Sequence, residues 1–439
     1  MFELRLLNKL LIVFVLIVLL GCSTQVSPVP LPSLTLTKTV KPVPTSTKVP
    51  TTTITPVPME TRTATPSLTS TVPKPEPFVN NCIKLSDGLP PPVYRPNDIL
   101  LLREDEAPYR PYLLNLAGGV KTSLTGPSGE DILRIFVSPD RQWLAYDTHS
   151  YIVLANTKGK TLKQISREKD WTFFWGWLDD NQLMVTRKAD REATTPATLV
   201  VINLSTGKYQ ELTQMEYPDF DWINFLPWQH NRVIYDPTLT LAIYPSHSGE
   251  PGSVTLLDIP NNKVLAALPA DVVFTPQPEW APNREAFVVA GTTTQTRLED
   301  GNTWYNQELF LIDRNGKITQ LTHFTDIYPY VSIGNAKWSP DGRQIAFWFS
   351  IQFGANEQLA VLDLDTLQVT NYCTTGRESH MGGSSQLFWS PDSQIVVFNH
   401  YEGDDTPAKV MWIDVKNEWG KYGSVMGTGF TVSGWLVSP

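Results

Sequence analysis

The sequence contains six histidines, the side chains best suited to bind a transition metal or to transfer protons near neutral pH. Five of them fall in polar segments that we expect to form long loops. These are His149, His247, His323, His380 and His400. The sixth, His230, lies in a predicted tight turn. Because no two histidines share a close metal-ligand spacing, we expect no bound metal and no cofactor.

Other signals for catalysis are weak. The run HMGGSS, which begins at His380, suggests an oxyanion loop, but the chain has no G-x-S-x-G nucleophile elbow. The acidic run YEGDD at 401–405 could bind Ca²⁺, although a solvated turn explains it more simply. No Gly-rich phosphate loop follows a strand and opens a helix. We therefore expect a protein that binds and does not catalyse.

The first of three cysteines indicates where the protein is located. Cys22 ends the string LLGC, after a basic start and the apolar run 10–21, which is too short for a comfortable membrane span. The string resembles the lipobox of bacterial lipoproteins, apart from Leu20, a less usual residue at its position. The resemblance implies that residues 1–21 are a signal peptide and that lipid on Cys22 anchors the protein to a membrane of the bacterial cell envelope, outside the cytoplasm. Ser23, in place of Asp, then favours the outer membrane where two membranes are present.

Cys82 and Cys373 remain as an even pair. In an oxidising compartment such a pair permits one disulfide. It would tie the segment before the repeats to the sixth repeat. Two buried free thiols are the alternative.

Residues 22–78 have the composition of a tether. Residues 23–77 contain twelve prolines and many threonines, and almost nothing in them could bury a core. We expect a disordered Thr/Pro-rich linker that would span roughly 40 Å on average as a flexible coil.

The globular remainder, residues 79–439, is acidic. Seven of the 35 Lys and Arg and three of the 44 Asp and Glu precede residue 78, so the rest holds 28 basic and 41 acidic residues, a formal charge of −13. Nucleic acid requires a basic stripe on its partner, so this balance argues against nucleic acid binding. An acidic surface on an exported protein usually serves solubility, and we expect a monomer.

An apolar run that ends in a turn recurs seven times, as in LVVINLSTGK, LFLIDRNGK and LAVLDLDTLQ. The polar markers of the seven copies are Asn115, Ala155, Asn203, Asp258, Asp313, Asp363 and Asp414. Their intervals of 40, 48, 55, 55, 50 and 51 residues predict an all-β fold, a seven-bladed β-propeller. Each period also holds a hairpin of the type WSPDGRQIAFWF, in which Pro, Asp and Gly suit a tight turn. We take LPWQHNRVIYD as a degenerate copy of this hairpin.

The string WSPDGRQIAF and the x-L-T strand before it resemble the TolB-like family of propellers, the PD-type relatives of WD repeats. The resemblance covers residues 90–439 and implies a fold of six or seven blades. Its motifs specify structure and not chemistry. The Tol-system protein carries an extra N-terminal α/β domain, for which we see no room between the linker and Asp98, so its partners are not carried over.

The C-terminal string GWLVSP matches the first strand of a hairpin without the second. The first blade begins abruptly at RPNDILLLR, which matches a second strand. We therefore expect the C-terminal strand to complete the first blade and close the ring, which removes exposed sheet edges. The segment PPVYRPND could supply that strand instead, but its prolines cannot donate ladder hydrogen bonds.

Strand direction alternates within a blade, so the connections divide between two ends of the ring. The first-to-second and third-to-fourth turns are short, as in SPDG and RNGK, and define the tight-turn face. The second-to-third and inter-blade segments are long, as in AGTTTQTRLEDGNTWYNQ, and define the long-loop face. Insertions gathered on one face of a repeat protein usually mark its binding side, with drift in unconstrained loops as the alternative.

We predict that the long-loop face binds a protein, peptide or polysaccharide of the cell envelope. Aromatic and arginine anchors carry most of the energy at interfaces. The candidate binding residues are Arg297, Asp300, Trp304, Tyr305, Arg377, Glu378 and His380. A sugar could stack on Trp304, Tyr305 and Tyr244, which we place in inserted loops. The alternative function is a metal-dependent polysaccharide lyase or a hydrolase with its site at the mouth of the channel.

A further group of tryptophans lies on or beside predicted innermost strands. They are Trp171, Trp175, Trp177, Trp222, Trp280, Trp338, Trp389 and Trp435. Large aromatic side chains at such positions favour packing of blade against blade.

Overall fold

The computed structural model describes twelve stretches of the chain: 77–87, 97–104, 109–166, 171–187, 198–212, 233–246, 252–270, 278–375, 385–400, 407–417, 419–423 and 429–438. The predicted signal peptide, Cys22 and the linker up to residue 76 lie outside the described residues. The chain divides into two units, 1–70 and 71–439, and the description below concerns the second.

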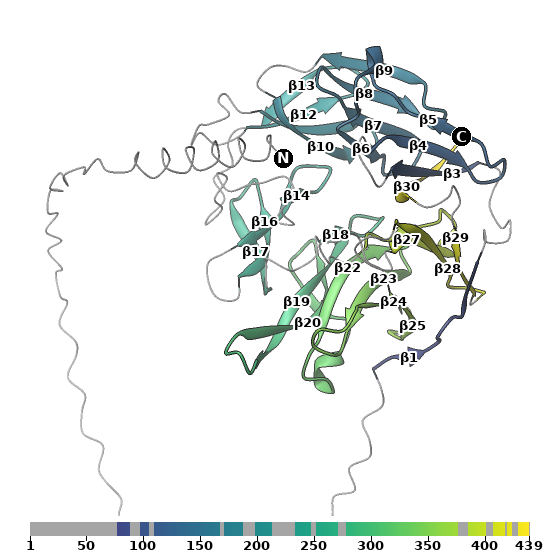
Figure 1. Cartoon of the computed structure of the whole chain (residues 1–439). Coiled ribbons are helices and arrows are strands. Elements are labelled where there is room, and N and C mark those ends of the chain that lie inside the picture. The colour runs from purple at the N-terminus through teal and green to yellow at the C-terminus, as the bar shows by residue number, and fades with distance from the viewer. Residues whose placement is uncertain are drawn as a thin grey trace, which may run out of the picture. The chain divides into compact units, whose positions relative to one another are not determined.

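Seven sheets form the blades of a propeller, each with four antiparallel strands, and the sheets of blades 6 and 7 have a fifth, parallel strand at the edge (Figure 1). Blade 1 holds β30 (Phe430–Val437), β3 (Asp98–Glu104), β4 (Pro111–Asn115) and β5 (Lys121–Ser123), and blade 2 holds β6 (Arg134–Val137), β7 (Trp143–Asp147), β8 (Tyr151–Asn156) and β9 (Thr161–Ser166). Blade 3 holds β10 (Trp171–Asp179), β11 (Gln182–Arg187), β12 (Thr198–Asn203) and β13 (Tyr209–Leu212), and blade 4 holds β14 (Ile234–Tyr235), β15 (Leu241–Ser246), β16 (Ser253–Asp258) and β17 (Lys263–Pro269).

The remaining blades follow the same order. Blade 5 holds β18 (Glu279–Trp280), β19 (Ala286–Arg297), β20 (Thr303–Asp313) and β21 (Ile318–Gln320), and blade 6 holds β22 (Ser332–Trp338), β23 (Gln344–Ser350), β24 (Gln358–Asp363) and β25 (Val369–Thr375). Blade 7 holds β26 (Phe388–Trp389), β27 (Ile395–His400), β28 (Lys409–Asp414) and β29 (Trp419–Gly423). Two short 3₁₀ helices, η1 (Pro127–Gly129) and η3 (Phe324–Asp326), lie in connections, and the described residues contain no α-helix. The predicted seven-bladed, all-β fold is confirmed.

The core is divided among the blade interfaces. Seven clusters of buried apolar side chains each join one blade to the next, and the last joins blade 7 to blade 1 through Trp412 and Trp435. Figure 1 shows these sheets side by side around the ring. Because both faces of a blade are covered, the third-strand repeats read as nearly continuous apolar runs.

The ring closes as predicted. β30 pairs antiparallel with β3, from Asp98 opposite Val437 to Glu104 opposite Phe430. Gly434 makes this possible, because a side chain there would meet Val137 at 2.5 Å. The C-terminal strand is therefore the innermost strand of blade 1, and we call its pairing with β3 the seam.

Inner-strand tryptophans join the blades, as expected. The Trp338 indole Nε1 donates to the Glu279 carbonyl oxygen at 3.1 Å, and Trp389 Nε1 donates to the Lys337 carbonyl oxygen at 3.0 Å. Trp177 makes the same contact with Phe136 at 3.1 Å. Trp280 and Trp435 are buried. The side chains of Trp171 and Trp175, and Trp222 as a whole, lie outside the described part.

The predicted position of the first hairpin of blade 4 was wrong. Its inner strand is β14, and the turn that follows is D-P-T-L, 236–239, in the place that S-P-D-G occupies in blade 6. The Leu239 backbone has φ 58°, matching 70° at Gly342. The prediction placed the turn near His230, which lies outside the described residues. It searched for a string similar to the S-P-D-G hairpins and did not recognise that D-P-T-L can form the same turn.

A feature that the sequence reading missed is a pair of added edge strands. β1 (Val79–Asn80) pairs parallel with β25, and β2 (Leu85–Asp87) pairs parallel with β29. Segment 77–87, which we call the strap, therefore runs along the outer edges of blades 6 and 7 (Figure 1).

Candidate functional site

The β19–β20 hairpin of blade 5 is longer than its counterparts. β19 has 12 residues and β20 has 11, against 7 and 6 in the equivalent strands of blade 6. The prediction treated this segment as a loop, but the ladder continues to Arg297 opposite Thr303. Thr-rich, β-branched sequence on β19 and the aromatic pair Trp304 and Tyr305 on β20 favour that extension. The hairpin projects from the long-loop face (Figure 1).

Buried polar side chains hold this hairpin against the segment that leads into blade 6. The Glu308 carboxylate, fully buried, accepts hydrogen bonds from Thr322 Oγ1 at 2.5 Å and from the Thr325 amide at 2.6 Å. Asn306 Oδ1 accepts from the Val331 amide at 2.9 Å. Hydrogen bonds to a buried carboxylate are strong, so the hairpin and segment 322–331 form one rigid platform.

Three aromatic side chains meet on this platform. The Trp304 ring lies edge-on to Phe353, with centroids 5.2 Å apart, and Tyr330 lies 5.9 Å from Phe353. The Trp304 indole donates to the Val331 carbonyl oxygen at 3.3 Å. Phe353 is 49% exposed although it is a large apolar residue. We call Trp304, Tyr330 and Phe353 the aromatic cluster. Trp304 lies near the tip of the hairpin on β20, Tyr330 in the segment before β22, and Phe353 in the connection between β23 and β24.

The structure separates the predicted binding residues. Trp304 and Tyr305 are neighbours on β20, so their side chains point to opposite faces of the hairpin, and the aromatic cluster contains only Trp304. Arg297 is exposed at the end of β19. The Asp300 carboxylate holds the turn itself, because it accepts from the Asn302 amide and side chain, each at 2.9 Å.

Two further outcomes concern the predicted residues. Tyr244 was placed wrongly: it lies in β15 and is 2% exposed, because the shifted hairpin of blade 4 turns the supposed loop into a core strand. Arg377, Glu378 and His380 lie outside the described residues. Sequence reasoning missed Phe353 and Tyr330, although an aromatic residue in the polar loop IQFGANEQ was a usable signal.

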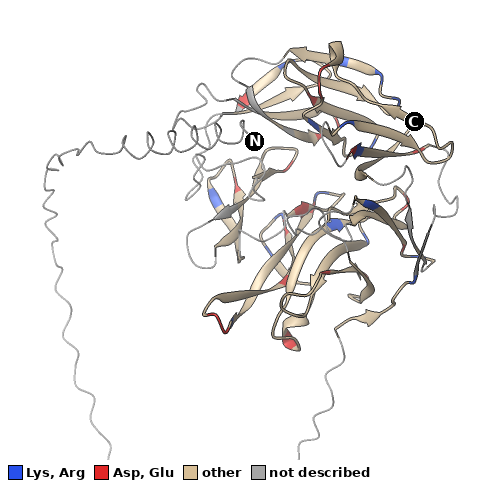
Figure 2. Ribbon diagram, in the orientation of Figure 1, with Lys and Arg blue, Asp and Glu red and all other residues tan. Residues whose placement is uncertain are grey.

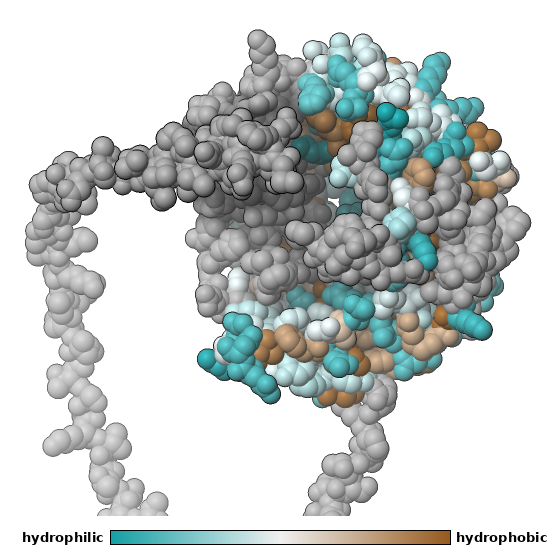
Figure 3. Space-filling view, viewed as in Figure 1, coloured by the Kyte–Doolittle hydropathy of each residue, from teal (hydrophilic) through white to brown (hydrophobic). Residues whose placement is uncertain are grey.

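The tip of the β19–β20 hairpin carries charged residues. Figure 2 shows acidic residues at the end of the β19–β20 hairpin, where Glu299 and Asp300 follow Arg297. In Figure 3 hydrophobic residues lie beside this hydrophilic tip, at the lower left of the view. The platform thus offers aromatic surface next to groups that can make polar contacts.

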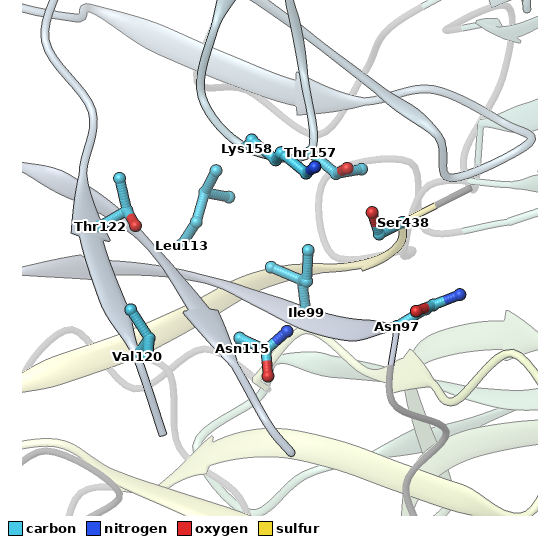
Figure 4. Close-up of a pocket in the computed structure, with 9 residues that line it drawn as sticks. All are labelled: Asn97, Ile99, Leu113, Asn115, Val120, Thr122, Thr157, Lys158 and Ser438. Atoms are coloured by element: carbon cyan, nitrogen blue, oxygen red, sulfur yellow. The ribbon is translucent and has the colours of Figure 1, made fainter. Parts of the chain in front are cut away.

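The tight-turn face has a cavity of about 380 Å³ between blades 1 and 2. Figure 4 shows Ile99 and Leu113 from blade 1 facing the β8–β9 turn, which carries Thr157 and Lys158. Lys158 is the one charged residue of this lining. The cavity contains none of the predicted binding residues, so it is an independent candidate on the opposite end of the ring.

The inner strands carry charged groups near the tight-turn face. Lys337 Nζ lies 3.0 Å from Glu279 Oε2, and the Glu279 side chain is 29% exposed. Burial raises the pKa of Glu279 above its usual range, although Lys337 and Arg141 act in the opposite direction. Arg141 donates to the Trp389 carbonyl oxygen at 2.8 Å, and burial lowers its pKa. The ion pair joins blade 6 to blade 5, and the Arg141 hydrogen bond joins blade 2 to blade 7.

Cys82 and Cys373 form a disulfide in the structure, with Cα atoms 4.9 Å apart. Among the described residues, no group of three or more His, Cys, Asp and Glu side chains is placed to hold a metal ion. No helix in the described part of the chain is long and apolar enough to cross a membrane.

No protein-family model and no curated protein matches the sequence. Among solved structures, TolB from Acinetobacter baumannii is similar at 14% identity and TM-score 0.39, over 74% of this chain and 78% of that one. A protein assigned as TolB from Agrobacterium tumefaciens has 13% identity and TM-score 0.34, over 78% and 99% of the two chains. A protein of unknown function from Desulfotomaculum acetoxidans has 12% identity and TM-score 0.46, over 77% and 98%. The fold assignment rests on the strand pairing of this chain itself.

Proposed function

We propose that the protein is a non-catalytic binding protein of the bacterial cell envelope. Lipid on Cys22 holds it outside the cytoplasm, and the long-loop face captures a protein, peptide or polysaccharide. The observation that carries this proposal is the rigid platform with its aromatic cluster. An exposed aromatic group on an element fixed by buried hydrogen bonds binds with little loss of conformational entropy.

The site also has the composition that recognition requires. Trp304 and Phe353 offer ring faces and edges, and Arg297 lies at the tip of the same hairpin. Aromatic and arginine side chains are enriched among the residues that dominate binding energy. Sugar rings and extended peptides both pack on such rings, so both are ligand classes for this surface.

Capture can be tested with a glycan array and a random-peptide phage library as probes. We expect Trp304→Ala and Phe353→Ala to weaken the Kd of the selected probe at least tenfold, which corresponds to about 1.4 kcal/mol. The matched controls are Asn315→Ala, in a turn on the other face, and Lys158→Ala, in the cavity lining; both should leave the Kd unchanged. Loss of capture in Lys158→Ala with normal capture in Trp304→Ala would place binding at the cavity and contradict the proposal.

Anchoring is tested separately. Cys22→Ala should abolish palmitate labelling of the expressed protein and release it from the membrane fraction. The control is the double variant Cys82→Ser, Cys373→Ser, which keeps Cys22 and should still be labelled. A Cys22→Ala protein that is labelled and floats with membranes would end the lipoprotein hypothesis.

One observation favours a hydrolase as the alternative. The Glu279 carboxyl group lies on an inner strand with its Oε2 atom 3.0 Å from Lys337 Nζ, and burial raises its pKa, so it is the candidate general acid. The test is turnover of envelope polysaccharide by the wild type and by Glu279→Gln. Measurable turnover that Glu279→Gln abolishes would replace the binding proposal with the enzymatic one.

A further inference from the structure

Apart from its disulfide, the strap is held to the propeller by a few backbone pairs and by the packing of one aromatic ring. Phe78 packs its ring 5.3 Å from Phe349 and 6.2 Å from Tyr328, against the buried cluster between blades 5 and 6. β1 contributes two paired residues and β2 three. Val79 remains 49% exposed. So few pairs would separate easily under tension applied from the N-terminal side.

The next element along the chain is the one that closes the ring. β3 begins at Asp98, and Asp98 lies opposite Val437 at the end of the seam. Tension that passed through the strap would therefore reach the seam at its end and break its pairs one after another. A tether attached in this way would load the junction that closes the ring.

The disulfide lies between the N-terminal tether and the seam along the chain. Cys82 lies between β1 and β2, upstream of β3, and its partner Cys373 belongs to β25 in blade 6. β25 is paired with β24 on both sides of a bulge that contains Cys373, and β24 in turn is paired with β23. Force that arrives at Cys82 therefore enters the sheet of blade 6 through a covalent bond.

The local backbone is arranged to present Cys373 to the strap. The β24–β25 ladder changes register between Asn371 and Thr375, and Cys373 adopts φ 55° there, a conformation unfavourable for residues other than glycine. Asn371 Oδ1 accepts from the Cys373 amide at 2.9 Å, and Asn371 Nδ2 donates to Asn80 Oδ1 at 2.8 Å. One side chain thus fixes both the bulge and the strap beside it.

We propose that the Cys82–Cys373 bridge is a mechanical clip that diverts load on the tether away from the seam and into blade 6. The inference rests on the proposed function in one respect: load on the N-terminal side comes from an anchored tether. Reduction removes the clip, because two electrons and two protons from a dithiol convert the bridge to two thiols while the dithiol becomes a disulfide.

The clip can be tested by pulling single molecules of the full chain in magnetic tweezers. One handle is attached at the N-terminal end and the other at an azide-bearing residue that replaces Asn315, an exposed turn position in blade 5. In the oxidised protein the first extension step should open blades 5 and 6 together. After reduction of the folded wild type, we expect an earlier step of about 50 Å, the extended length between Cys82 and Asp98, with a lifetime at constant force at least tenfold shorter.

Cys82→Ser is the matched variant and should behave like the reduced wild type. Identical first-step lifetimes for oxidised, reduced and Cys82→Ser proteins would overturn the clip. Reduction of protein that is already folded keeps the test valid if the variant folds poorly. Failure here is distinguishable from failure of the proposed function, because palmitate labelling and probe capture are measured on unloaded protein.

Discussion

The two ends of the ring use their polar groups differently. On the tight-turn face, turn side chains bond within their own turn or to the next blade, as Ser339 does with Asp341 at 2.6 Å and Asp236 with Arg314 at 3.0 Å. On the long-loop face, buried polar groups fix a hairpin whose tip and aromatic cluster remain partly exposed. The difference separates stability from recognition: one end of the ring secures the blades, and the other can vary to suit a ligand.

The largest effect should come from removing the seam. Deleting residues 430–439 takes the innermost strand from blade 1 and exposes the edge of β3, so we expect a loss of several kcal/mol, comparable with the stability of a whole domain. Thermal unfolding followed by circular dichroism measures it, with deletion of Pro439 alone as the control. An unchanged melting temperature would show that ring closure does not depend on this strand.

A smaller loss is expected from Asp236→Ala on the tight-turn face. The buried carboxylate accepts from the Leu241 amide at 2.7 Å and from Arg314, so its removal leaves buried donors unsatisfied and costs about 3 kcal/mol. The control is Asp365→Ala, which removes an exposed pair with Arg343 and should not change stability. Probe capture should be normal in both variants; weakened capture in Asp236→Ala at a temperature where it is folded would break the separation of the two faces.

Asp236 should also make the stability of the protein depend on pH. Burial alone would raise the pKa of Asp236, but hydrogen bonds from Thr238, the Leu241 amide and Arg314 hold it below the usual 3.8. A carboxyl group with a lowered folded-state pKa stabilises the protein above its unfolded pKa, and that contribution is lost as the pH falls through the folded value. The stability difference between wild type and Asp236→Ala should therefore be constant above pH 5 and shrink below 3.8. A difference that grows toward low pH would contradict the assignment.

The smallest stability change should come from Phe353→Ala on the long-loop face. An exposed side chain outside the buried apolar clusters contributes within about 0.5 kcal/mol. Chemical denaturation measures this change, and the comparison is with Phe347→Ala, whose buried ring should cost about 3–5 kcal/mol. A large loss of stability in Phe353→Ala would mean that the aromatic cluster holds the blade and is not available for binding.

Much of the fold was predictable because the repeats carry local signals. Pro340 presets one backbone angle of its turn, and Ser339 Oγ accepts from the Gln344 amide at 2.9 Å, so S-P-D-G encodes its own hairpin. In blade 4 the carboxylate and the hydroxyl group of this turn have changed places. Asp236 stands at the position of Ser339 and accepts from the Leu241 amide, and the Thr238 hydroxyl, at the position of Asp341, donates to Asp236. Letters alone do not reveal this exchange, which is why that hairpin and Tyr244 were misplaced.

The candidate site was less predictable for a related reason. The sequence placed Trp304 on the long-loop face, because strand parity fixes the end of the ring at which each connection lies. It did not predict that Phe353 and Tyr330 would meet Trp304, because they come from another blade and an inter-blade segment. It also did not predict that Asp300 would be used to hold its own turn.

By itself the sequence determined the repeat number, the closing strand and the division into two faces, because each follows from periodicity and local turn chemistry. Tertiary structure alone decided three other features: the register that makes 286–313 a projecting hairpin, the bulge that turns Cys373 toward the strap, and the blade contacts that gather the aromatic cluster. Those features depend on pairs of residues far apart in the chain. No local pattern records which distant segment will supply the partner.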